Sequence, residues 1–269
     1  MPQRAWCLIL ALAASAAAPA DRARDLARDA WVTIRDHPFE MTVIEEAAKH
    51  LDEAMQLNKN EPYVWLGTAE LIMNGGFGPG AAFSAEAYAP GTLEKALPVI
   101  QHAVKLDPKL ADAHASLAYV LILLRKYPEA RTEIDAARQL DPGGFRTNLY
   151  DAVWHWKQGN TASSREALKR ATAVGTSPAE QRRILYLLES QAIERGDDVQ
   201  EEKLLKLIVA VDPNDPWSHG NYGWFLIGKE RYDEAVAEFQ RAIAIAPYPL
   251  AEQGLHRAIE LRDRVRARQ

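Results

Sequence analysis

Residues 111–144, ADAHASLAYVLILLRKYPEARTEIDAARQLDPGG, decide the fold of this chain. They contain two segments whose apolar residues fall on one face of a helix, with a turn between them. Small residues stand where two antiparallel helices approach each other closely, namely Ala118 in the first segment and Ala130 and Ala137 in the second. Pro128 lies in the first turn of the second segment, where its missing N–H costs no hydrogen bond. The stretch therefore predicts a helical hairpin.

The hairpin belongs to a series with a fixed period. Pro108 and Pro142 lie 34 residues apart and each closes the tripeptide Leu-Asp-Pro. A third segment, closed by Pro247, lines up with the one before Pro142, and its Tyr232-Asp233-Glu234-Ala235 takes the place of Tyr127-Pro128-Glu129-Ala130. This period is the length of a two-helix unit that buries its apolar face only by stacking on copies of itself. We expect neighbouring hairpins to share one continuous apolar seam.

The segments closed by Pro142 and Pro247 resemble the tetratricopeptide repeat family, whose pattern has a Leu-Gly pair, aromatic residues, central alanines and a closing proline. Leu117-Ala118 and Tyr222-Gly223 stand at the position of the Leu-Gly pair. The resemblance covers residues 61–249, and three carboxyl residues depart from it where the family has aromatic or small residues: Glu70, Glu189 and Glu201. It implies an all-α fold, a right-handed superhelical solenoid of tetratricopeptide-like helix hairpins with a C-terminal capping helix.

The predicted organisation places a signal peptide at 1–20, a helical pair at 21–60, repeats at 61–249 and a charged capping helix at 250–269. The repeats are interrupted by a glycine-rich insertion at 74–91, whose glycines and prolines exclude a long regular helix. Its aromatic residues are Phe77, Phe83 and Tyr88. Two interpretations stay open, because long loops are commonly functional or disordered. The insertion either folds across the edge of the groove and contributes to binding, or is a merely tolerated loop.

The N-terminus has the order of a secretory signal. A basic start ending at Arg4 is followed by an apolar run from Ala5 to Ala17 and by small residues up to Ala20. We therefore expect cleavage after Ala20 and an exported protein, periplasmic or secreted; a buried first helix or an uncleaved anchor is the alternative. No later stretch of about 20 apolar residues occurs, so the mature chain is expected to have no membrane span. The only cysteine, Cys7, lies in the signal, which excludes disulfides and thiol chemistry in the mature chain.

Composition and motifs argue against several classes of function. A net charge of −5 is unlike the basic excess of nucleic-acid-binding proteins. None of the seven histidines has another three or four residues away, so no helical metal pair exists. The sequence contains no nucleophile motif, and its glycine-rich run lacks the lysine and hydroxyl residue of a phosphate loop. We expect no catalytic activity, metal or cofactor, and we expect His114 and His219, at the same repeat position, to be structural.

In the family that these segments resemble, the first helices line the concave side of the superhelix, where peptides bind. Carried over to matching positions, the resemblance predicts partner-binding side chains at Tyr119, Arg146, Tyr150, Arg183, Tyr186, Trp217, Asn221 and Trp224. Tyrosine, tryptophan and arginine often dominate the binding energy of interfaces. Packing between neighbouring helices is the alternative role for each of them.

The function that the resemblance implies is a non-catalytic scaffold or adaptor. It would bind a peptide or partner helix in its concave groove, with envelope or secretion assembly in a bacterial periplasm as the expected setting. The alternative is a structural subunit of an oligomer without a separable ligand. The sequence specifies neither the partner nor the oligomeric state, and it does not assign a role to the insertion.

Overall fold

The computed structural model describes residues 18–37, 40–78 and 82–268, which form thirteen α-helices and one 3-10 helix. The helices are α1 (Pro19–Asp36), α2 (Met41–Leu57), α3 (Pro62–Gly76), α4 (Thr92–Leu106), α5 (Ala111–Leu123), α6 (Tyr127–Leu140), α7 (Phe145–Lys157), α8 (Thr161–Val174), α9 (Pro178–Arg195), α10 (Asp198–Val211), α11 (Pro216–Gly228), α12 (Tyr232–Ile245) and α13 (Pro249–Arg266), with η1 (Ala85–Ala87) before α4. Consecutive helices pair from α1–α2 to α11–α12, and α13 packs on the last pair. The predicted all-α solenoid of helical hairpins is confirmed.

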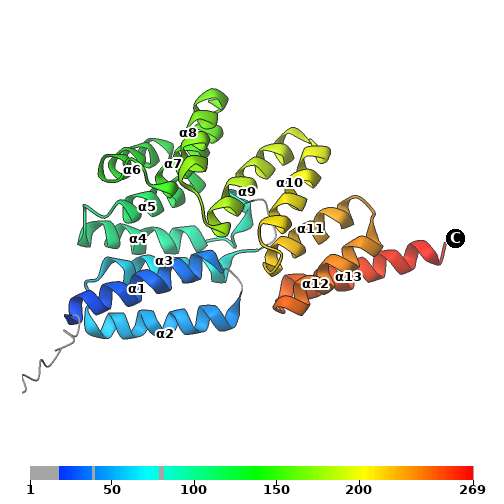
Figure 1. The fold of residues 1–269 in the computed structure, drawn as a ribbon, viewed down its shortest axis with the longest axis horizontal. Coiled ribbons are helices and arrows are strands. Elements are labelled where there is room, and N and C mark those ends of the chain that lie inside the picture. The colour runs from blue at the N-terminus through cyan, green and yellow to red at the C-terminus, as the bar shows by residue number, and fades with distance from the viewer. Residues whose placement is uncertain (1–17, 38–39, 79–81, 269) are drawn as a thin grey trace, which may run out of the picture.

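The pairs follow one another around an arch whose two ends are formed by α1–α3 and α11–α13 (Figure 1). The insertion after α3 lies between these ends, near the centre of the molecule. Residues 1–17 of the predicted signal peptide lie outside the described residues, and α1 begins at Pro19. Among the described residues, no helix combines the length and the hydropathy that crossing a membrane requires.

The helices end where the repeated prolines predict. The second helices α4, α6 and α12 end two residues before Pro108, Pro142 and Pro247. Within four pairs, the turn between the helices contains one residue in the left-handed region: Arg125 (φ 59°), Gly159 (φ 73°), Gly196 (φ 65°) and Glu230 (φ 58°). Glycine adopts this conformation without strain, whereas a residue with a Cβ pays a conformational cost there.

Small residues allow the close packing that the repeat pattern predicts. Phe239 of α12 is fully buried and inserts between α11 and α13. A Cβ atom at Gly223 of α11 would lie 2.9 Å from its ring, and a Cβ atom at Gly254 of α13 would lie 2.3 Å from it. Two glycines on facing helices therefore make the space that this ring occupies.

The two histidines at equivalent repeat positions make the same contacts. His114 Nδ1 lies 2.6 Å from a carboxylate oxygen of Glu133, and its Nε2 lies 3.0 Å from the carbonyl oxygen of Pro108. His219 repeats this arrangement with the carboxylate of Glu238 at 2.7 Å and a backbone carbonyl at 3.0 Å. Because carboxylates and carbonyls only accept hydrogen bonds, this arrangement favours the protonated imidazole, which donates from both nitrogens. The hydrogen bond to Glu133 accordingly raises the pKa of His114.

The apolar core is divided, which differs from the expected continuous seam. One cluster of buried side chains extends from α1 to α8 and reaches Leu187 of α9, and a second extends from Leu205 to Ala258 in α10–α13. Polar contacts occupy the junction, where Arg182 of α9 forms an ion pair with Asp212 and lies 3.8 Å from Asp215. Since Arg182 and Asp215 are buried at the start of α11, they interrupt the apolar surface between α9 and α11.

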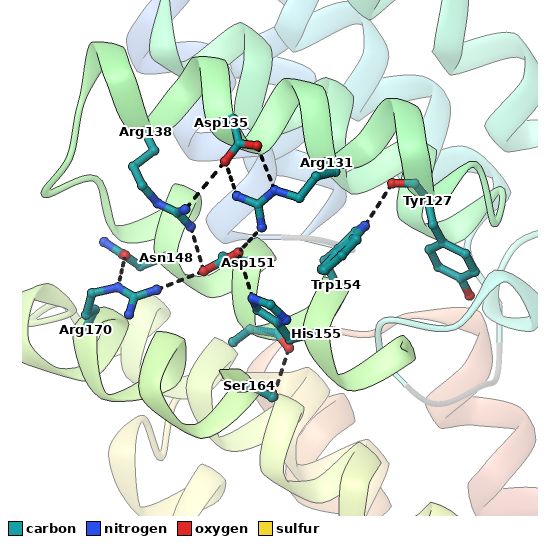
Figure 2. Close-up of polar contacts among 11 residues, drawn as sticks. Tyr127, Arg131, Asp135, Arg138, Asn148, Asp151, Trp154, His155, Ser164 and Arg170 are labelled. Carbon is teal, nitrogen blue, oxygen red and sulfur yellow. Dashed lines mark hydrogen bonds and ion pairs between the residues drawn. The ribbon is translucent and has the colours of Figure 1, made fainter. Parts of the chain in front are cut away.

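A second polar cluster lies between α6, α7 and α8 (Figure 2). The carboxylate of Asp151 on α7 is 2% exposed and lies 2.8 Å from Arg131, 2.6 Å from Arg138 and 2.8 Å from Arg170. Beside it, Trp154 Nε1 donates a hydrogen bond to the carbonyl oxygen of Tyr127 at 2.9 Å. Three guanidinium groups thus compensate one buried carboxylate and connect three helices.

Candidate functional site in the concave cavity

A cavity of about 320 Å³ lies inside the arch. Its wall takes side chains from the first helices of the pairs, from the insertion and from α13. Ten of the eleven residues singled out from the sequence line it: Phe77, Phe83, Tyr88, Tyr119, Tyr150, Arg183, Tyr186, Trp217, Asn221 and Trp224. The structure therefore brings together residues that are spread over about 150 positions of the chain; their role in binding a partner stays a prediction.

Arg146 is the residue that the structure places elsewhere. It is buried at the start of α7, where its guanidinium forms an ion pair with Asp112 of α5. The same guanidinium lies 3.9 Å from the ring centroid of Trp31 on α1. A carboxylate and an aromatic face thus hold Arg146 between three first helices, behind the wall of the cavity.

The tyrosines of the wall also pack against one another. Tyr119 and Tyr150 stack with ring centroids 4.8 Å apart and planes inclined by 15°. The hydroxyl oxygen of Tyr88 lies 3.3 Å from that of Tyr119. Burial raises the pKa of both Tyr88 and Tyr119, so these phenols stay protonated. These three side chains therefore support the wall as well as lining it.

The insertion begins at the end of the arch formed by α1–α3 and contacts α11 at the other end. It leaves α3 and returns to α4 as a short antiparallel turn, in which Gly78 N donates to Ala87 O and Ala89 N donates to Gly76 O, each at 2.7 Å. Helix α3 runs to Gly76, further than the glycine-rich run predicts. Glycine at position 76 allows the close approach of α4, because a Cβ atom there would lie 2.0 Å from the hydroxyl of Thr92.

The far side of the insertion contacts α9 and α11. Ser190 Oγ of α9 donates a hydrogen bond to the carbonyl oxygen of Ala82 at 2.8 Å. The rings of Phe77 and Trp217 of α11 meet edge to face with centroids 5.6 Å apart. Phe83 is 5% exposed and its ring centroid lies 6.0 Å from that of Tyr119. The insertion thus folds across the groove, while its contribution to binding stays a prediction.

The end of α1 closes the cavity from another side. Arg183 of α9 donates to the carbonyl oxygen of Arg35 at 3.1 Å, and Arg182 donates to that of Asp36 at 3.4 Å. Arg35 also forms an ion pair with Asp36, with Nε 2.7 Å from Oδ1. The first helix pair therefore touches the fifth directly, although more than 140 residues separate them in the sequence.

Three polar side chains of the cavity wall lack a hydrogen-bond or ion-pair partner among the described residues. Among the residues that the structure describes, Glu70, Glu189 and Asn221 make no side-chain hydrogen bond and no ion pair, and all three line the cavity. Burial raises the pKa of Glu189 to about 8, and the neighbouring carboxyl of Glu201 adds to this effect. Burial also raises the pKa of Glu70, against the opposing influence of Arg183.

Sequence reasoning did not include Glu70 and Glu189 among the site residues. The available signal was their departure from the family pattern, since both stand where the family has aromatic or small residues. Within residues 18–37, 40–78 and 82–268, no group of three or more histidine, cysteine and acidic residues is arranged to hold a metal ion.

Comparison with known proteins identifies the repeat. Residues 218–249, which contain α12 and all of α11 except its first two residues, match the model of the tetratricopeptide repeat family. No curated protein is similar in sequence to the chain. One similar solved structure is TTC0263, a tetratricopeptide repeat protein of Thermus thermophilus, with 13% identity and a TM-score of 0.53, covering 77% of this chain and 99% of that one.

Two larger structures share the fold. Yeast Tom70 is 16% identical with a TM-score of 0.52, covering 83% of this chain and 44% of that one. The Cut9–Hcn1 structure is 13% identical with a TM-score of 0.51, covering 89% of this chain and 48% of that one. The chain thus spans less than half the length of these two proteins, and the likeness shows the fold alone. Residues 218–249 thus match a tetratricopeptide repeat, and the helix pairs of the chain share the fold of these solved structures.

Proposed function

We propose that this protein is a non-catalytic interaction scaffold that receives a short segment of a partner protein in the cavity inside the arch. The observation that carries the proposal is the convergence of Asn221, Trp217, Trp224 and other first-helix side chains on one cavity. Clefts of about 300 Å³ and above, mostly apolar with a few polar groups, are typical of ligand sites. Tetratricopeptide repeats are in general interaction modules, which supports a partner that is a protein or peptide.

The size of the cavity favours a short extended segment over a helix. An α-helix with its side chains is about 10–12 Å across. The insertion already occupies the middle of the concave face, with Phe83 buried against Tyr119. About 320 Å³ remains, which suits a few side chains of a partner and leaves no room for a helix along the whole groove.

Asn221 is the group best placed to hold the main chain of such a segment. It is half-buried on α11, and its amide has no partner among the described residues. An amide offers a donor and an acceptor side by side, which matches the N–H and C=O groups of an extended peptide. Its replacement costs no internal hydrogen bond, so a loss of binding would not reflect a loss of folding.

A display library of random twelve-residue peptides tests the proposal, followed by titration of the enriched peptides with the purified protein. Asn221→Ala is expected to weaken binding about tenfold, the effect of one lost hydrogen bond in a desolvated site. Val199→Ser on α10 is the matched control, because Val199 is 82% exposed. If no peptide is enriched, or if Asn221→Ala and Trp217→Ala bind as the unmodified protein does, the proposal is wrong. Association that depends on protein concentration and ignores these substitutions would instead indicate an oligomer subunit.

We also propose that the protein is exported and cleaved after Ala20. The first buried side chain of α1 is Ala23, followed by Ala27, Ala30 and Trp31. Cleavage after Ala20 would leave this apolar face intact. The mass of the protein isolated from the producing cells tests this, and a chain that retains residues 1–20 would contradict it.

A further inference from the structure

We infer that the cavity binds an organic cation, the ammonium or guanidinium group of a partner's lysine or arginine side chain, beside Glu189, Tyr186, Trp217 and Trp224. The inference rests on the proposed function and specifies which side chain of the partner enters the cavity. It depends on two independent features of the cavity, an uncompensated buried carboxyl group and aromatic rings in the same wall.

The first feature is the carboxyl group of Glu189. The residue is 8% exposed, lines the cavity and has neither a hydrogen bond nor an ion pair among the described residues. The charged group that acts on it is Glu201 of α10, a second carboxyl, so no cation among the described residues compensates it. Burial of a charge without a partner is strongly unfavourable, and a ligand cation would supply the missing charge.

The cations of the cavity are engaged elsewhere. Arg35 pairs with Asp36, and Arg182 pairs with Asp212. Arg183 donates to a backbone carbonyl and acts on the carboxyl of Glu70. The wall contains four carboxyl groups, Asp36, Glu70, Glu189 and Asp215, against three guanidinium groups. This balance disfavours an anionic ligand and leaves Glu189 as the group in need of a counter-charge.

The second feature is the aromatic wall of the same cavity. Tyr186 precedes Glu189 by one helical turn on α9 and therefore lies on the same face, and both line the cavity together with Trp217 and Trp224 of α11. The faces of tyrosine and tryptophan rings attract cations, most strongly in desolvated sites. A divalent metal ion instead needs several oxygen ligands at close range, and the described residues form no such group. Aromatic walls with one carboxyl group therefore fit an organic cation that has an apolar stem.

Binding of a cation must be linked to protonation. Since the pKa of Glu189 is about 8, the cavity binds a cation at neutral pH only with release of a proton. The charged group that acts on Glu189 is Glu201 on α10. The other charged groups that line the cavity are Arg35, Asp36, Glu70, Arg182, Arg183 and Asp215. The affinity for a permanently charged guanidinium should therefore rise with pH, by up to about tenfold per pH unit below pH 8.

The test uses butylguanidinium as the probe, with 1-butanol and butyrate as neutral and anionic analogues. Binding is followed at pH 8.5 by the NMR signals of the indole N–H groups of Trp217 and Trp224. Butylguanidinium is expected to bind at millimolar concentration and to shift both signals, whereas the analogues leave them unchanged. Glu189→Gln should weaken binding at least fivefold, and Glu252→Gln, an exposed carboxyl on α13, should not change it.

A second variant keeps the test decisive if Glu189→Gln perturbs folding. Ile193 lies one turn after Glu189, lines the cavity and is 39% exposed. Ile193→Lys would place an internal ammonium beside the carboxyl, and it is expected to abolish binding of butylguanidinium. Equal binding of 1-butanol and butylguanidinium, or unchanged binding by both variants, would overturn the inference.

A peptide arm separates this inference from the proposed function. In each enriched peptide, lysine is replaced by norleucine and arginine by citrulline, which removes the charge and keeps the stem. We expect at least a tenfold loss of affinity. Peptides that bind equally well without their charges would refute the cation site and leave the scaffold function standing, while the absence of any bound peptide would refute the scaffold function itself.

Discussion

Replacement of Glu189 by glutamine should make the protein more stable in alkaline solution. Glutamine has nearly the same shape as a protonated glutamic acid, so Glu189→Gln keeps the packing of α9 and removes the titration. In the unmodified protein the group must either hold its proton or bury a charge without a partner. The glutamine of the variant neither binds a proton nor carries a charge.

The sign and the size of the effect follow from the two pKa values. The pKa of Glu189 is about 8 in the folded chain, against 4.5 as its ordinary value. Because the folded state holds this proton more tightly, the group's stabilising contribution is complete below pH 4.5 and is lost as the pH rises through 8. Between pH 5 and pH 9 the loss is on the order of 4 kcal/mol. Glu189→Gln should match the unmodified protein at pH 5 and exceed its unfolding free energy by about this amount at pH 9.

Urea unfolding followed by far-ultraviolet circular dichroism measures the difference at pH 5, 7 and 9. Other groups titrate in this range, so the quantity of interest is the difference between variant and unmodified protein at each pH. Glu252→Gln is the control, because its exposed carboxyl predicts no change of this difference with pH. If the difference in unfolding free energy between Glu189→Gln and the unmodified protein is the same at pH 5 and pH 9, the account of this buried carboxyl is wrong.

Three further predictions concern the polar cluster, the turns and the histidines. In urea unfolding, Asp151→Asn should lower the free energy of unfolding by about 3 kcal/mol, because three guanidinium groups lose their buried partner. Asp135 is half-exposed in the same cluster, so Asp135→Asn should lower the free energy of unfolding much less. In thermal unfolding, Gly196→Ala should destabilise the protein by about 1 kcal/mol, and Glu230→Gly should stabilise it by up to about 1 kcal/mol, since both residues have left-handed backbones. NMR titration should give His114 a pKa above the value of about 6.5 for an unfolded chain, because of its hydrogen bond to Glu133. The contribution of this hydrogen bond to the free energy of unfolding is present below pH 6.5 and is lost as the pH rises through the pKa of His114 in the folded protein.

The sequence predicted those features that local periodicity determines. Helix ends before Pro108 and Pro142 follow from the repeat itself. The convergence of Tyr119, Tyr186 and Trp224 on one cavity follows from their common place on first helices, which the repeat superimposes.

Features that depend on contacts distant in the sequence could not be predicted in this way. The insertion is held by Ser190 and Trp217, each of which lies more than 100 residues after the insertion residue that it contacts. Arg146 turns from the groove because Asp112 and Trp31 attract its guanidinium, and no periodic signal pairs these residues. The apolar seam is interrupted because Arg182 meets acidic side chains at the junction of two pairs, whose alignment only the folded chain reveals.

The cross-connection of the arch by the insertion has a mechanical consequence. In an open stack of repeats each unit touches only its neighbours. Small rotations between units therefore accumulate along the array, and the array extends elastically under force. Here Ser190 holds the carbonyl of Ala82, and Arg183 holds that of Arg35, across units that are not neighbours. These links keep the rotations from accumulating and set a fixed width for the opening. Pulling on the two ends of the chain should therefore give a stiff response until these hydrogen bonds break, followed by the compliance of an ordinary array.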